Sequence, residues 1–140
     1  MEKSLNKLSI KTKINGVTVL IEPELSGHGI RISGLDKDNV KNGVSVHYVE
    51  NFGKFVPLDL QVYETGICGK SYVFDCVTGI FTQFIEFSNG CKLVGMDKRT
   101  INKHKSDADK YYKQAKNMLG EITESKCPFV KALMYTKIKG

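Results

Sequence analysis

Apolar and polar residues alternate along much of the first two thirds of the chain, and this period of two predicts β-strands. The segments 8–14 and 17–21 both alternate, with Asn15-Gly16 between them. Asn-Gly is a preferred two-residue hairpin turn because both of its residues tolerate a positive φ. A two-residue turn at this point places the apolar residues of both segments on one face. Turn chemistry and hydrophobic pattern therefore predict the same register.

Further apolar runs predict a series of short strands. They cover residues 30–32, 44–48, 58–62, 72–77, 81–87 and 91–94. Asn89-Gly90 predicts a second hairpin, between the last two runs. The connections are too short for the crossover helices that parallel strands need, so we expect an antiparallel sheet of about seven or eight short strands.

After residue 95 the apolar residues recur at spacings of three and four, which predicts an amphipathic helix over 101–122. Ser106 and Asp109 have the spacing of a capping box, so the stable part of this helix is expected to begin there. Gly120 can end the helix. A second helix is predicted over residues 123–137, with Pro128 in its first turn.

The sequence thus predicts an α+β fold in a single domain, residues 1–140. An N-terminal antiparallel β-sheet, residues 1–95, is followed by two C-terminal α-helices in a basic part, residues 96–140. Hydrophobic residues make up 41% of the chain and charged residues 26%, as is typical of a soluble globular protein. The pattern contains no secretory signal and no membrane span, so the expected location is cytoplasmic.

The four cysteines and three histidines predict no metal site, because none of them forms the close-spaced pairs that zinc sites use. Reduced cysteines in a folded core are expected instead. A nucleophilic set can be assembled on paper from Cys68 or Cys76, His47, and Asp59 or Asp75. Any chain with this composition offers such combinations, so we expect no catalytic residues and no cofactor.

The net charge of the chain lies in its C-terminal part. Residues 1–95 hold ten basic and ten acidic residues, whereas residues 96–140 hold eleven basic and five acidic residues. On a continuous helix, the face opposite the apolar stripe carries Arg99, Lys103, Lys110 and Lys113. Such a face can bind phosphate groups, and the alternative is a solvated face that keeps the protein soluble.

Most aromatic residues of the predicted strands are expected in the core. Phe84 and Phe87 are the rings most expected at the surface, because polar residues accompany them, and we add them to the candidate site. Residues 66–71 end in Gly-Lys-Ser, like a phosphate-binding P-loop. The first glycine of that motif is missing and a strand follows instead of a helix, so a glycine-rich β-turn is predicted there.

The chain is small and rich in lysine, has no tryptophan, and is predicted to have a sheet followed by helices. In this general character it resembles bacteriophage accessory proteins, including anti-defence proteins. The resemblance implies a protein that occludes a host protein, sequesters a cyclic or ADP-ribose-type nucleotide signal, or binds DNA. The order of sheet and helices is similar to one class of nucleotide-sequestering proteins, and no site residues are carried over from it.

We therefore expect a small non-enzymatic binding protein, an inhibitor or sequestering factor. Its partner would be a host protein or a small anionic nucleotide, bound through the basic C-terminal helices. The runner-up is a nucleic-acid-binding module that uses the same helix face, and the third reading is an enzyme with an unrecognised site. No membrane partner is expected. Exposed edge strands also predict a homo-oligomer.

Overall fold

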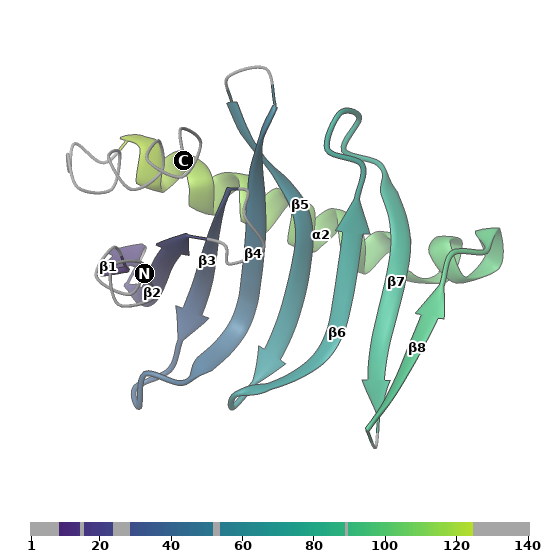
Figure 1. Ribbon diagram of the computed structural model, residues 1–140, viewed down its shortest axis with the longest axis horizontal. Helices are drawn as coiled ribbons and strands as arrows, with labels where there is room; N and C mark the ends of the chain where they lie inside the picture. The colour runs from purple at the N-terminus through teal and green to yellow at the C-terminus, as the bar shows by residue number, and fades with distance from the viewer. Residues whose placement is uncertain (1–8, 15, 24–28, 52–53, 89, 125–140) are drawn as a thin grey trace.

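The computed structural model describes residues 9–14, 16–23, 29–51, 54–88 and 90–124. They form an eight-stranded antiparallel sheet in which the strands lie side by side in sequence order, followed by one helix (Figure 1). The elements are β1 (Ile10–Ile14), β2 (Val17–Pro23), β3 (Ile30–Leu35), β4 (Lys41–Asn51), β5 (Lys54–Glu64), β6 (Ile67–Phe74), β7 (Phe81–Ser88), β8 (Cys91–Gly95) and α2 (Lys98–Glu124). The α+β class and the antiparallel sheet fit the prediction.

Both hairpins form in the register that their Asn-Gly turns predict. Ile14 pairs with Val17 across the first turn, and Ser88 pairs with Cys91 across the second. The glycines of the two turns have φ angles of 82° and 77°, a region that residues with a Cβ avoid. The alternation of the flanking strands then sends one face of the sheet into the core.

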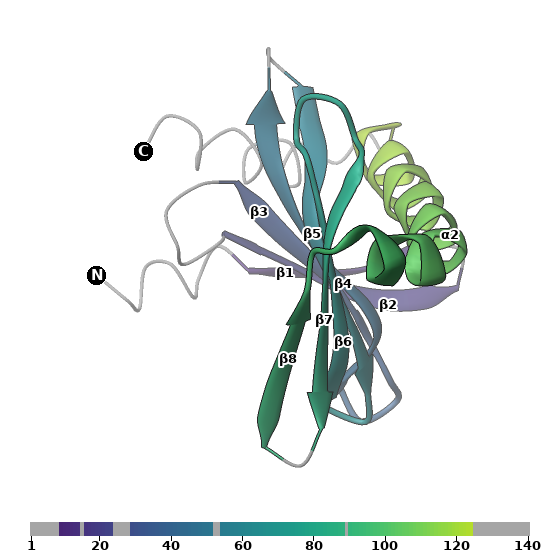
Figure 2. The same cartoon turned by 90° about the vertical axis from the view of Figure 1, so that its right-hand side faces the viewer.

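The helix α2 packs across one face of the sheet (Figure 2). Its small buried residues, Ala108 and Ala115, let the helix backbone approach the strands closely. At the centre of this contact the Tyr48 hydroxyl donates a hydrogen bond of 2.7 Å to the Ala115 carbonyl. Fully buried aliphatic and aromatic side chains fill the layer between helix and sheet, among them Ile21, Ile30, Ile32, Val46, Leu60 and Tyr72.

The prediction of two C-terminal helices is wrong for the residues that the structure describes, which contain a single helix after the sheet. α2 continues through Gly120, the residue expected to end it. A glycine inside a helix costs about 1 kcal/mol relative to alanine. Met118 and Leu119 pack against the core on the preceding turn, and this packing outweighs that cost. Residues 125–137 of the predicted second helix lie outside the described part of the chain.

The start of α2 also differs from the prediction, because the helix begins at Lys98 and Ser106 lies inside it. Asp97 caps this start: its carboxylate accepts the Thr100 backbone N–H at 3.1 Å and the Thr100 hydroxyl at 2.7 Å. The first helical turn has unpaired amides, and an aspartate before it satisfies one of them. The capping box predicted at Ser106 is therefore not the helix start.

The strand predicted over 72–77 ends earlier, at Phe74. Asp75 opens a turn there, and its carboxylate accepts the backbone N–H groups of Val77 at 2.8 Å and Thr78 at 2.9 Å. An aspartate side chain that bonds the backbone ahead of it favours a turn over a strand. Val77 consequently lies at the surface, 68% exposed, although it is apolar.

Two buried tyrosines give a matched test of this core. The hydroxyl of Tyr48 bonds to Ala115, whereas the buried hydroxyl of Tyr72 has no hydrogen-bond partner among the described residues. We expect Tyr48→Phe to lower the free energy of unfolding by about 1 kcal/mol. Tyr72→Phe should leave it unchanged or raise it, because an unpaired polar group is removed. Urea denaturation measures both, and equal losses for the two variants would contradict the packing described here.

Candidate functional site

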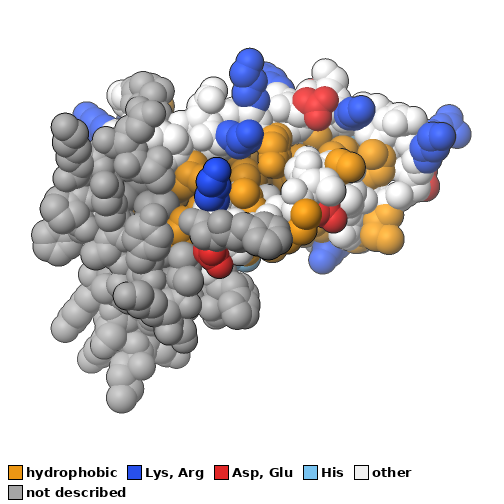
Figure 3. Space-filling model, turned by 90° about the horizontal axis from the view of Figure 1, so that it is seen from above, with side chains coloured by type: hydrophobic (Ala, Val, Ile, Leu, Met, Phe, Trp, Pro, Cys, Tyr) orange, Lys and Arg blue, Asp and Glu red, His pale blue; other side chains and the backbone are white. Residues whose placement is uncertain are grey.

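A groove lies between the second half of α2 and the strands β1 to β4, with a volume of about 490 Å³. Small-molecule sites in proteins commonly enclose about 300–1,000 Å³. We call it the α2 groove; it is lined by Ile14, Val17, Val19, Gly34, Asn42, Gly43, Val44, Lys110, Lys113, Gln114, Asn117 and Met118. The space-filling view from above shows hydrophobic side chains gathered between Lys and Arg side chains on the described part of the molecule (Figure 3).

The floor of the α2 groove is apolar and belongs to the sheet. Ile14, Val19 and Val44 are core residues whose side chains also line the groove. Gly34 lies where the β3–β4 register shifts, and a Cβ on it would come within 2.6 Å of the Asn42 carbonyl oxygen. The absence of a side chain at Gly34 therefore lets the two strands approach and leaves the floor open beside them.

The rim of the α2 groove is polar and comes from α2. Lys110 and Lys113 are three residues apart, a spacing that places side chains near one another on a helix, and both are exposed. Gln114 and Asn117 add amide groups, which can donate or accept hydrogen bonds. Sequence reasoning missed both amides, although their spacing from Lys110 and Lys113 could have found them. Cations, amides and an apolar floor together suit an anionic ligand with an apolar or aromatic part.

Lys103 and Phe84, also predicted as site residues, line a different hollow. It lies beside β7, β8 and the first half of α2 and has a volume of about 290 Å³. Glu86 and Asp97 line it as well, so its charge is mixed. The expectation that Phe84 is exposed is wrong, because its ring is 4% exposed and stacks on His104 at 3.7 Å between ring centroids. A residue of the helix covers the ring, and the pattern of the strand alone does not show that.

The remaining predicted residues line neither space. Arg99 is exposed on the first turn of α2, and Phe87 is half-buried on β7 opposite Lys92. Phe87 is three residues beyond Phe84, so strand alternation turns it to the face away from α2. The six predicted residues thus divide into two in the α2 groove, two in the second hollow and two elsewhere.

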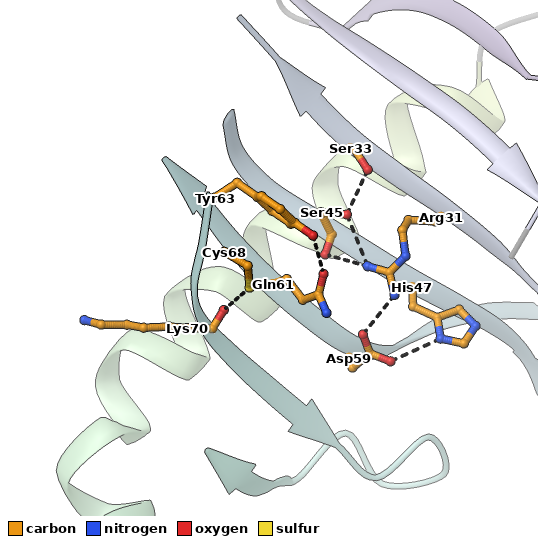
Figure 4. A network of polar contacts seen from close by, with 9 residues as sticks. All are labelled: Arg31, Ser33, Ser45, His47, Asp59, Gln61, Tyr63, Cys68 and Lys70. Carbon is orange, nitrogen blue, oxygen red and sulfur yellow. Dashed lines mark hydrogen bonds and ion pairs between the residues drawn. The ribbon is translucent and has the colours of Figure 1, made fainter. Parts of the chain in front are cut away.

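The face of the sheet away from α2 holds a polar network at its centre (Figure 4). Arg31 on β3 lies 3.2 Å from a carboxylate oxygen of Asp59 on β5, and His47 Nδ1 on β4 lies 3.1 Å from the other oxygen. Arg31 also donates to the Ser45 hydroxyl at 3.1 Å, and Ser45 bonds the buried Ser33 hydroxyl at 2.8 Å. One carboxylate thus joins three neighbouring strands.

The electrostatics of this network favour a charged Asp59. Burial would raise the pKa of the Asp59 carboxyl, but the hydrogen bond with His47 and the positive charge of Arg31 hold the pKa below its usual range. The guanidinium of Arg31 is engaged with Asp59 and Ser45. We therefore interpret the network as one that stabilises the packing of the three central strands against one another.

The dependence of the free energy of unfolding on acid pH tests this interpretation. A carboxyl with a lowered pKa stabilises the folded state above its unfolded pKa, and this stabilisation is lost as the pH falls through the folded pKa. Asp59→Asn is expected to lower the free energy of unfolding at neutral pH by about 2 kcal/mol. The variant should also lose less stability than the wild type between about pH 5 and pH 2. Denaturation curves across that range check both results; parallel pH profiles for the two proteins would contradict the role of Asp59.

The nucleophilic set considered from the sequence is not assembled. His47 and Asp59 do contact one another, but the Cys68 thiol donates to the Lys70 carbonyl oxygen at 3.6 Å. Burial raises the pKa of this thiol, which disfavours the reactive thiolate. Asp75 and Cys76 lie in the turn after β6.

The glycine-rich β-turn predicted over residues 66–71 is wrong for most of that segment: only Gly66 lies in a turn, and the residues from Ile67 onward already belong to β6. Thr65 and Gly66 have φ angles of 48° and 82° in the turn between β5 and β6. Lys70 and Ser71 belong to β6 and pair with strands on both sides. No helix N-terminus follows them, so the backbone of this segment lacks the phosphate-binding geometry.

Within the described ranges, no three His, Cys, Asp or Glu side chains lie close enough together to hold a metal ion. No helix in that part of the chain is long and apolar enough to cross a membrane. No protein-family model matches the chain, and neither a curated protein nor a solved structure matches it.

Proposed function

We propose that this protein is a non-enzymatic binding protein that holds a small anionic ligand of the nucleotide class in the α2 groove. The observation that supports this most is the lining of one groove by Lys110 and Lys113 together with an apolar floor. A nucleotide offers matching parts, because its phosphates suit the lysines and its base suits the apolar floor.

Two further features support binding without chemistry. His47 and Asp59 are the pair that most resembles a catalytic pair. Asp59 also binds Arg31, which in turn donates to Ser45, so the pair belongs to a network within the sheet. Burial raises the pKa of the Cys68 thiol, a potential nucleophile, and so disfavours the reactive thiolate. Sequestration of a nucleotide signal by a bacteriophage accessory protein is the biological form of this proposal, and it rests on the general resemblance alone.

The runner-up is nucleic-acid binding along the outer face of α2. It is favoured by the continuity of the helix, which places the exposed Arg99, Lys103 and Lys110 along one side. Against it, Asp107 and Asp109 interrupt the basic residues, and lysine is a weaker reader of phosphate geometry than arginine. Binding through a phosphate backbone would also weaken steeply with added salt.

Calorimetric titration of the full chain tests the proposal. The titrants are ADP-ribose, cyclic di-AMP and a short DNA duplex, each at low and at high salt. We expect saturable binding of at least one nucleotide, with affinity that survives high salt. Binding of the duplex alone, with a steep loss in salt, would favour the runner-up. Binding of none of the three titrants would overturn the proposal.

A further inference from the structure

The last strand of the sheet presents an exposed edge. β8 pairs with β7, and among the described residues no strand pairs with its other side. Its residues from Cys91 to Val94 are all exposed, although Leu93 and Val94 are apolar and have exposed fractions of 61% and 50%. An unpaired strand edge is a template for the addition of a further strand.

The hairpin before β8 decides which of its backbone groups face outward. Ser88 and Cys91 pair across a two-residue connection. In such a hairpin the flanking residues form a hydrogen-bonded pair, and bonded and non-bonded pairs alternate along the ladder. Leu93 therefore directs its backbone N–H and C=O toward β7, as Cys91 does. Lys92 and Val94 direct theirs away from the sheet.

We propose that β8 pairs antiparallel with β8 of a second copy of this chain, which joins two sheets through a twofold axis. The outward groups require Lys92 of one copy to exchange hydrogen bonds with Val94 of the other. The two Leu93 residues then lie opposite one another at the axis, and Cys91 lies opposite Gly95. This register pairs the whole strand, Cys91–Gly95, and buries the two Leu93 side chains against each other.

Charge favours self-pairing of β8 over self-pairing of β1, the strand at the other edge of the sheet. By the same reasoning from its Asn-Gly turn, β1 directs the backbone groups of Lys11 and Lys13 outward. Self-pairing of β1 would place Lys11 opposite Lys13 of the second copy, and like charges opposite one another destabilise a ladder. In β8 the lysine lies opposite Val94, so no like charges oppose each other in that ladder. Self-association is therefore assigned to β8.

Molar mass by light scattering, with one backbone substitution, tests the pairing. We expect the wild type to have the mass of two chains at high concentration. Val94→Pro removes an outward N–H and leaves the bonds to β7 in place, so it should raise the dimer Kd about tenfold or more. Val94→Ala keeps the N–H and should remain a dimer. A monomeric wild type, or a Val94→Pro variant that dimerises as tightly, would overturn the proposal.

A disulfide experiment tests the register and does not depend on the proline variant folding. In a Cys91→Ser background, Leu93→Cys should form a disulfide-linked dimer on mild oxidation. Opposed residues of a non-bonded pair have Cα atoms about 4.5 Å apart, which a disulfide can span. Lys92→Cys in the same background faces Val94 and should crosslink no more than the background protein. Equal crosslinking by the two variants, or none by Leu93→Cys, would overturn the register.

Discussion

The double variant Lys110→Glu/Lys113→Glu is expected to bind a nucleotide about a hundredfold more weakly than the wild type, with the fold intact. Both side chains are exposed and line the α2 groove, so reversing their charge sets two carboxylates against the phosphates. Neither lysine lies in the buried core, so the thermal midpoint should change little. Calorimetric titration with ADP-ribose or cyclic di-AMP measures the loss.

The matched control is Lys98→Glu/Lys105→Glu. Both of these lysines are exposed on the same helix, and neither lines the α2 groove. The control changes the net charge of the protein by the same amount, so it removes the same general attraction for anions. We expect it to weaken nucleotide binding by less than about threefold. Equal losses for the two double variants would point to net charge and contradict a local site.

Gly29→Ala is expected to cause the largest loss of stability among single substitutions, about 3 kcal/mol or more. Gly29 has a φ of 84°, a backbone region that residues with a Cβ avoid. A Cβ at this position would overlap the Tyr48 carbonyl oxygen and lie 3.2 Å from the Val49 Cα atom. Both neighbours are backbone atoms of β4, so β3 and β4 would have to separate. Urea denaturation measures the effect.

Gly16 provides the control for Gly29. It has nearly the same φ, 82°, but a Cβ on it would meet nothing within 4 Å. Gly16→Ala should therefore cost only the conformational strain, about 1 kcal/mol. Similar losses for the two alanine variants would show that conformation alone decides and would contradict the close approach to β4. The backbone at Gly29 thus approaches β4 closely, whereas the backbone at Gly16 has open space beside it.

The sheet could be predicted from the sequence because its signals are local. A two-residue Asn-Gly turn sets the pairing of Ile14 with Val17, and period-two alternation then decides which face each side chain joins. The boundaries of the helix could be predicted less well than the sheet. Gly120 weakens a helix locally, but the packing of Met118 and Leu119 on the sheet decides the outcome, and that packing depends on residues far away in sequence.

The candidate site divides in the same way. Lys110 and Lys113 could be found from helical spacing, but the floor beneath them comes from β1 to β4 and is visible only in the folded chain. The burial of Phe84 under His104 depends on the helix crossing the sheet, so the sequence pattern misplaces it. Arg31, His47 and Asp59 each occupy an alternate position between two apolar residues of a strand, so alternation places them on the face away from the core. That signal was available, and the antiparallel order of the strands places the three residues side by side.

Amide chemical shifts locate a small anionic ligand in the α2 groove most directly. The labelled full chain would be titrated with ADP-ribose and with cyclic di-AMP. We expect the largest shifts on groove residues from both the sheet floor and the α2 rim, including Gly43, Val44, Gln114 and Asn117. Shifts confined to the outer face of α2 near Arg99 and Lys103, or to the sheet face around Arg31, would contradict binding in the α2 groove, and so would the absence of shifts with both nucleotides.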